Sequence, residues 1–176
     1  MPSVTRKLIA IVAACCLAVS VIAYVGSYLG MTMNGLLPLA AALHIGAFLF
    51  MVPMIVIEYP QVRERKYFWK KFSKDMPVWV APTIKMLGLF FAFHFGLFQL
   101  QSHGASPQIE NGEYVLNSHG HIMRVITQKE YLLLKGAEFR LFATGWMFFY
   151  FLSTTYWWFS RDSQHSVEIP SPPLGG

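Results

Sequence analysis

The sequence predicts an all-α membrane protein, an up-down bundle of four transmembrane helices with a small extracytoplasmic β-hairpin and an extended fourth helix. Of its 176 residues 55% are hydrophobic and 13% charged, which is far more apolar than an ordinary soluble domain. Four runs are each long enough to cross a hydrocarbon core of about 30 Å as a helix. These runs are apolar on all sides and do not alternate, which argues against the strands of a membrane β-barrel.

The predicted spans all fall within residues 1–160, which are therefore predicted to form a single domain. They cover residues 8–29, 36–57, 78–100 and 141–159. Lys85 is the one charged residue inside them, and an intramembrane charge is a functional candidate unless its long stem lets it snorkel to the interface. Residues 161–176 are rich in Pro and Gly and are predicted to form a disordered cytoplasmic tail.

The first apolar run has alternative interpretations as a cleaved signal or as a lipoprotein box at residues 12–15. Strong hydrophobicity continues well beyond Cys16, whereas a mature lipoprotein turns polar after its lipidated cysteine. We therefore expect an uncleaved span. Cys15 and Cys16 are adjacent and are the only cysteines, so the sequence holds no disulfide framework and no CxxC metal or c-type haem motif.

The orientation follows from the loop at residues 58–77, which carries six bases and three acids. Short loops rich in Lys and Arg remain in the cytoplasm, so both termini are predicted to be cytoplasmic in a multi-pass protein of the bacterial inner (plasma) membrane. The bases are Arg63, Arg65, Lys66, Lys70, Lys71 and Lys74. Because they flank the membrane, the net charge of +5 indicates attraction to anionic membrane lipid and no binding of nucleic acid.

The outer loop and hairpin occupy residues 101–140. Residues 101–112 contain Ser, Gly, Pro and Asn and are predicted to form a loop. Glu113–Leu116 and His121–Ile126 are predicted to be the two strands of a hairpin, because turn-forming residues stand between them.

A long helix is predicted to follow the hairpin. Thr127 and Glu130 form a T-x-x-E capping box, and Ile126 and Tyr131 stand at the positions of a hydrophobic staple. No strong breaker follows, so the helix is expected to run about 32 residues from Gln128 and to include the fourth span. Glu138 and Arg140 lie where this helix meets the outer leaflet, and are expected to anchor it or to contact a partner.

His44 and His94 are candidate cofactor ligands. Both are predicted about 9 to 12 Å below the outer surface, on antiparallel helices. Each is followed two positions later by glycine, Gly46 and Gly96, which could leave room for a flat ligand. Two imidazoles at matched depth can be the axial ligands of a b-type haem or bind a metal. The alternatives are a structural histidine bonded across helices, contact with a partner, or proton handling.

His103, His119 and His121 form a second group of candidates on the outer side. In a strand, residues 119 and 121 point the same way, so a His-x-His pair could bind copper or zinc, with His103 or Glu113 as a third ligand. Residue 119 also falls in the expected turn, where His is common for backbone reasons. Ordinary surface histidines and a pH-sensing role remain alternatives.

Function is constrained mainly by missing motifs. The chain has no GxSxG, HExxH, P-loop or GxGxxG pattern, which argues against the common enzyme classes. We expect a non-enzymatic accessory or structural subunit that associates with a membrane-protein partner or with itself. One alternative is a redox subunit that holds b-type haem between His44 and His94. Another is a small transporter, although the predicted spans lack acidic residues.

Several short motifs in residues 36–150 suggest a family. The chain resembles an uncharacterised family of small four-helix bacterial inner-membrane proteins, which implies this topology and no assigned activity. The motifs are Leu43-His44-Ile45-Gly46-Ala47-Phe48, Phe68-Trp69-Lys70, Pro77-Val78-Trp79, Glu138-Phe139-Arg140 and Trp146-Met147-Phe148-Phe149-Tyr150. Where the family has Ser-Gly-His before the Trp-Met pair, this chain has Ala143-Thr144-Gly145.

Overall fold

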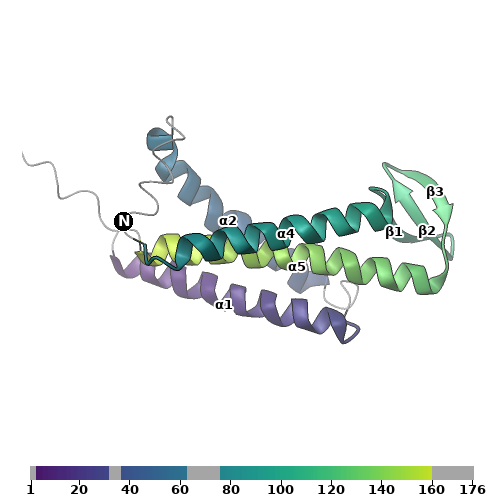
Figure 1. The fold of residues 1–176 in the computed structure, drawn as a ribbon, viewed down its shortest axis with the longest axis horizontal. Coiled ribbons are helices and arrows are strands. Elements are labelled where there is room, and N and C mark those ends of the chain that lie inside the picture. The colour runs from purple at the N-terminus through teal and green to yellow at the C-terminus, as the bar shows by residue number, and fades with distance from the viewer. Residues whose placement is uncertain (1–2, 32–36, 63–75, 160–176) are drawn as a thin grey trace, which may run out of the picture.

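The computed structural model describes residues 3–31, 37–62 and 76–159, which form four helices and a small sheet (Figure 1). The helices run alternately up and down, so the described chain begins and ends at the end of the bundle opposite the sheet. The elements are α1 (Ser3–Tyr28), α2 (Leu37–Val62), α4 (Val80–Ser102), β1 (Ser106–Glu110), β2 (Glu113–Ser118), β3 (His121–Val125) and α5 (Gln128–Phe159). The six bases of the predicted cytoplasmic loop and the predicted tail lie outside the described residues.

Three of the helices are long and apolar enough to cross a membrane: α1, α2 over Pro38–Val56, and α4. The fourth helix, α5, is the longest at 32 residues, and it is the central helix because α1, α4 and α2 all pack against it. A helix enclosed by other helices can carry polar residues on its packed faces. Thr144, Ser153 and Thr155 of α5 are buried in this way.

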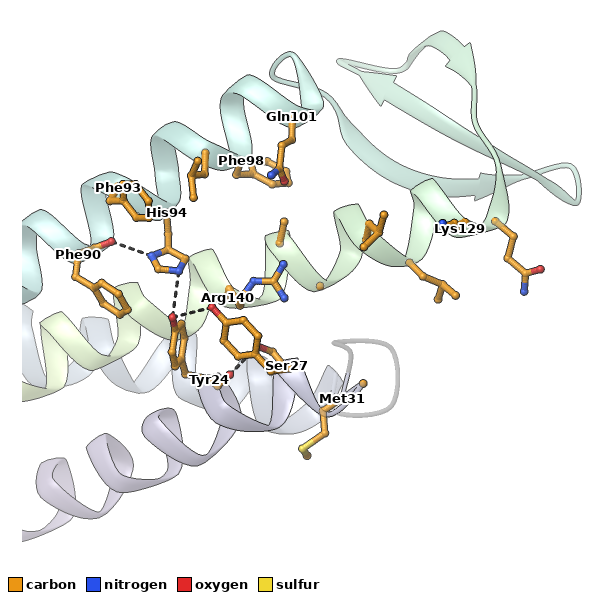
Figure 2. Close-up of a pocket in the computed structure, with 18 residues that line it drawn as sticks. Tyr24, Ser27, Met31, Phe90, Phe93, His94, Phe98, Gln101, Lys129 and Arg140 are labelled. Atoms are coloured by element: carbon orange, nitrogen blue, oxygen red, sulfur yellow. Dashed lines mark hydrogen bonds between the residues drawn. The ribbon is translucent and has the colours of Figure 1, made fainter.

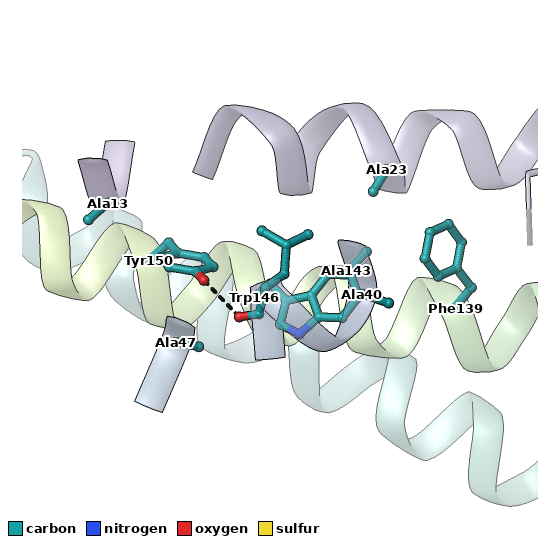
Figure 3. Packing of buried hydrophobic residues seen from close by; sticks show 9 residues of the cluster. Ala13, Ala23, Ala40, Ala47, Phe139, Ala143, Trp146 and Tyr150 are labelled. Atoms are coloured by element: carbon teal, nitrogen blue, oxygen red, sulfur yellow. Dashed lines mark hydrogen bonds between the residues drawn. The ribbon is translucent and has the colours of Figure 1, made fainter. Parts of the chain in front are cut away.

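The core of the bundle joins large aromatic side chains of α5 to small residues of α1 and α2 (Figure 3). Small residues at helix interfaces let the backbones approach closely. Tyr150 is fully buried and donates a hydrogen bond of 2.7 Å to the carbonyl oxygen of Leu43. The other buried members of this cluster are Ala13, Ala23, Ala40, Leu43, Ala47, Phe139, Ala143 and Trp146.

Gly46 owes its place to this core and not to a flat ligand. A Cβ atom at residue 46 would collide with the Tyr150 hydroxyl group, so glycine is required for the tyrosine to reach the backbone of α2. Gly96, in contrast, has open space around it, because no atom lies within 4 Å of where its Cβ would stand. The two His-x-Gly sequences therefore have different surroundings.

The outer segment contains one more strand than the sequence predicts. The prediction that residues 101–112 form a loop is wrong, because α4 continues to Ser102 and β1 occupies Ser106–Glu110. Strand β1 pairs antiparallel with β2 through a two-residue turn at Asn111 and Gly112, which both have positive φ. Asn-Gly is the preferred pair for such a turn, since both positions need the left-handed region. The predicted hairpin of β2 and β3 is present, with its turn at residues 119–120.

The start of α5 is built as the sequence predicts. The Thr127 hydroxyl accepts a hydrogen bond from the Glu130 amide at 3.2 Å, and the Glu130 carboxylate accepts one from the Thr127 amide at 3.1 Å. This backbone hydrogen bond, together with Arg124 at 3.1 Å, lowers the pKa of Glu130 below its ordinary value. A lowered pKa means that the carboxylate stabilises the cap at neutral pH and loses this effect as the pH falls through that pKa.

Buried side chains then hold the sheet on the first turns of α5. Ile126 and Tyr131, the two members of the predicted staple, pack in one cluster with Leu134 of α5 and Leu116 of β2. The Tyr131 ring also lies 4.9 Å from the Tyr114 ring, measured between centroids. The cap and this cluster together fix where the chain leaves the sheet and enters the long helix.

The capping box gives a first prediction. Thr127→Ala removes the hydroxyl acceptor of the box, and we expect it to destabilise the first turn of α5 by about 1 kcal/mol. Hydrogen exchange should then accelerate in residues 128–134 and remain unchanged in α1. Thr83→Ala is the matched control, because the Thr83 hydroxyl donates only to the Trp79 carbonyl group within α4. Equal hydrogen-exchange rates in residues 128–134 of the two variants would contradict the role of Thr127 as the capping residue of α5.

The close approach of Gly46 to Tyr150 gives a second prediction. We expect Gly46→Ala to lower the free energy of unfolding by about 1 to 3 kcal/mol because of the collision. Tyr150→Phe alone should cost about 1 kcal/mol through the lost hydrogen bond. The double variant should be more stable than the sum of the two losses predicts, since phenylalanine makes room for the methyl group. Thermal denaturation in detergent measures these stabilities, and Gly96→Ala is a control that should be nearly neutral. Strictly additive losses in the double variant would argue against the contact between Gly46 and Tyr150.

Candidate functional site

His44 and His94 do not face one another. His44 lines a cavity with Trp146, whose indole N–H donates to His44 Nδ1 at 3.4 Å. His94 lines a different cavity, where its Nε2 lies 3.3 Å from the Tyr24 hydroxyl and its Nδ1 lies 3.0 Å from the Phe90 carbonyl oxygen. Two axial ligands must point at one iron from opposite sides. The structure therefore does not bring these imidazoles together as a haem pair.

The three outer histidines are also not assembled into a metal site. Among residues 3–31, 37–62 and 76–159, no three His, Cys, Asp or Glu side chains form a group that could hold a metal ion. His103 follows the last residue of α4 with φ of 51°, and His119 stands in the second hairpin turn with φ of 53°. Their positions are thus explained by the left-handed backbone of a helix end and a turn. His121 is exposed on β3.

A large open cavity lies where α1 ends and α4 and α5 continue towards the sheet (Figure 2). Its volume is about 1110 Å³, and it is lined by side chains of all three helices. Apolar residues form most of the wall, including Phe93 and Leu97 of α4 and Leu132 and Leu133 of α5. We call this the outer cavity, because the sheet end of the bundle is the predicted extracytoplasmic end.

One side of the outer cavity holds a chain of hydrogen bonds (Figure 2). The Phe90 carbonyl oxygen can only accept, so His94 Nδ1 is the donor to it, and a neutral His94 then has Nε2 as its acceptor. The Tyr24 hydroxyl must therefore donate to His94 Nε2 and accept from the Tyr28 hydroxyl at 3.0 Å. All three side chains are fixed in orientation by this directional chain, and both nitrogens of His94 are occupied by protein groups.

Arg140 brings a positive charge into the outer cavity. Its guanidinium carbon lies 5.0 Å from the centre of the Tyr28 ring, a cation–π contact. Within the described part of the chain, no carboxylate lies within ion-pair distance of Arg140; Glu138 pairs with Lys135 at 2.7 Å, and Glu130 pairs with Arg124 at 3.1 Å. Gly136 makes room for this position, since a Cβ there would lie 3.2 Å from an Arg140 nitrogen. The cavity thus carries a positive charge without a carboxylate to balance it.

Sequence reasoning found Arg140 and His94 but missed the two tyrosines. Tyr24 and Tyr28 are four residues apart, so they share one face at the outer end of α1. That spacing was the available signal, since paired tyrosines at a helix end can hydrogen-bond with a neighbouring helix. Which residues of α4 and α5 they meet depends on how the helices pack, which the spacing does not specify.

Comparison with known proteins finds no family model, no curated protein and no solved structure that matches this chain. The family resemblance suggested by the short motifs therefore stays a prediction. Any function has to be argued from the cavities and their side chains.

The hydrogen-bond chain gives a third prediction. Neutral His94 should carry its proton on Nδ1, because only this tautomer satisfies both the Phe90 carbonyl group and the Tyr24 hydroxyl group. Nitrogen-15 NMR of the imidazole side chains measures the tautomer, and His94→Gln identifies the signals that belong to residue 94. The Nδ1–H form should persist in Tyr24→Phe, since the bond to Phe90 remains. A dominant Nε2–H tautomer would show that Tyr24 does not donate to His94 Nε2 as this hydrogen-bond chain requires.

Proposed function

We propose that this chain is a four-span integral protein of the bacterial inner membrane that binds an anionic amphiphile in its outer cavity. In this proposal it acts as a non-enzymatic accessory subunit, either with a membrane-protein partner or as a homo-oligomer. The observation that carries the proposal is Arg140: a guanidinium in a mostly apolar cavity, with no carboxylate of the described residues to neutralise it.

The membrane placement rests on helix length and on position. Three helices are apolar enough to span a bilayer, and α5 runs antiparallel beside α1 from the Arg140–Tyr28 contact to the cluster of Ala10 with Trp157. A central helix that accompanies a spanning helix over this length is best explained as the fourth span. The basic loop at residues 58–77 supports an orientation in which the sheet and the outer cavity lie on the extracytoplasmic side.

The ligand class follows from the lining of the outer cavity. Guanidinium groups bind carboxylates and phosphates through two parallel hydrogen bonds, and the ammonium group of Lys129 adds a second positive charge to the same lining. The apolar wall of Phe93, Leu97, Leu132 and Leu133 suits the chains of an amphiphile. Arg140 and Lys129 stand eleven residues apart on α5, about 16 Å along the helix, so an anionic headgroup would bind at Arg140 while its chains lie along α4 and α5.

Binding without catalysis is favoured by the state of the polar groups. Both nitrogens of His94 are already bonded to protein atoms, and the Tyr24 hydroxyl links His94 with Tyr28. A general base must have a free lone pair within hydrogen-bond reach of its substrate. This arrangement supports a role in positioning a ligand. No observation in the described residues specifically favours the haem or transporter alternatives.

The fourth prediction tests this function by native mass spectrometry of the protein released from nanodiscs. The discs contain equal parts of phosphatidylglycerol and phosphatidylcholine with identical acyl chains. We expect the wild type to retain phosphatidylglycerol preferentially. Arg140→Gln should reduce this preference at least about tenfold, because a charged hydrogen-bond donor is lost.

Lys85→Gln is the matched control for this experiment. It removes the same charge from an exposed position near the opposite end of α4, so it should leave the lipid preference unchanged. Circular dichroism confirms that both variants are folded. A wild type without preference for the anionic lipid, or equal losses in the two variants, would refute the proposed function.

A further inference from the structure

A second cavity lies between α2 and α4, with α5 as its floor. Its volume is about 320 Å³, and none of its lining residues belongs to the outer cavity. His44, Phe48 and Phe95, which are all exposed, lie on the two helices that flank it. In a bilayer, these residues would face the lipid, so a molecule dissolved in the membrane could enter the cavity from the side.

His44 has one nitrogen that none of the described residues uses. An indole N–H can only donate, so Trp146 makes His44 Nδ1 an acceptor, and neutral His44 therefore carries its proton on Nε2. This Nε2–H group makes no hydrogen bond to any residue that the structure describes. An unsatisfied donor within the hydrocarbon region is costly, since water is absent there. A ligand that brings a hydrogen-bond acceptor would remove this cost.

The walls of the cavity are mostly aromatic. Phe91 and Phe95 come from α4, and Phe142, Trp146 and Phe149 come from α5. Gly145 lets the Phe91 ring pack closely on α5, because a Cβ there would lie only 3.2 Å from that ring. None of the described residues in the lining carries a charge. These features select an uncharged ligand with a planar ring that can stack on or meet the edges of the aromatic side chains.

We propose that this cavity binds the ring of a membrane-soluble quinone, with one ring carbonyl oxygen accepting a hydrogen bond from His44 Nε2. A substituted six-membered ring fits a cavity of this size, and its apolar tail would leave between α2 and α4 into the lipid. The ester carbonyl group of a phospholipid is also a hydrogen-bond acceptor. It stands on a flexible chain without a ring, so it gains less free energy from packing against the aromatic walls. This proposal concerns binding alone, and it does not depend on the anionic site of the outer cavity.

The fifth prediction uses quenching of tryptophan fluorescence by a decyl-substituted benzoquinone. The protein is placed in nanodiscs of ether-linked lipid, which has no ester carbonyl groups. Trp146 lies in the cavity wall, so bound quinone should quench its emission saturably, above the linear quenching that follows from partition into the bilayer. His44→Phe keeps an aromatic ring but removes the donor, and we expect it to weaken binding about tenfold.

His94→Phe is the matched control, because it makes the same substitution in the outer cavity and should leave quinone affinity unchanged. Arg140→Gln should also leave it unchanged, which separates this proposal from the anionic site. A second measurement needs no variant: the infrared stretch of an isotope-labelled quinone carbonyl group should shift to lower frequency when the wild-type protein binds it.

Four outcomes would overturn the proposal. Purely linear quenching in the wild type would show that no site exists. Equal affinity in His44→Phe, or an unshifted carbonyl band, would show that His44 does not hold the ring. Saturable binding that disappears in ester-linked lipid would assign the cavity to a phospholipid carbonyl group instead.

Discussion

Close contact between α5 and the small residues of α1 and α2 supports the rest of this structure. Tyr150 and Trp146 can lie at the centre of the bundle only because alanine and glycine face them from the neighbouring helices. Lipid is as apolar as the side chains, so helices in a membrane associate through close packing and interhelical hydrogen bonds. The bond from Tyr150 to the Leu43 carbonyl group supplies one of these and also fixes how α2 lies on α5.

Both cavities occur where this packing around α5 is incomplete. The outer cavity opens because α1 ends at Tyr28, while α4 and α5 continue to the sheet. The second cavity, which His44 lines, opens because α2 and α4 both pack on α5 and leave a gap between them. Among the described lining residues, the outer cavity has bases and no carboxylate, and the second cavity has no charged side chain. The uneven packing around α5 therefore leaves two chemically different surfaces.

Local signals predicted the elements well wherever a motif acts on its own neighbours. The capping box and staple placed the start of α5 at Gln128, and turn residues located the hairpin of β2 and β3. Strand β1 was missed because five residues that include a proline show no clear alternation. The Asn111-Gly112 turn was the better signal, but it becomes a hairpin only when Ser106–Glu110 finds β2 as its partner.

The sequence by itself determined the apolar helices, the capped start of α5 and the positions of His44 and His94 along their helices. These properties depend on composition and on contacts between residues close in the chain. Only the tertiary structure decided that His44 meets Trp146, that His94 meets Tyr24, and that Arg140 meets Tyr28 with no described carboxylate beside it. The reason is geometric: helical spacing fixes height and face, whereas packing on α5 determines which faces meet.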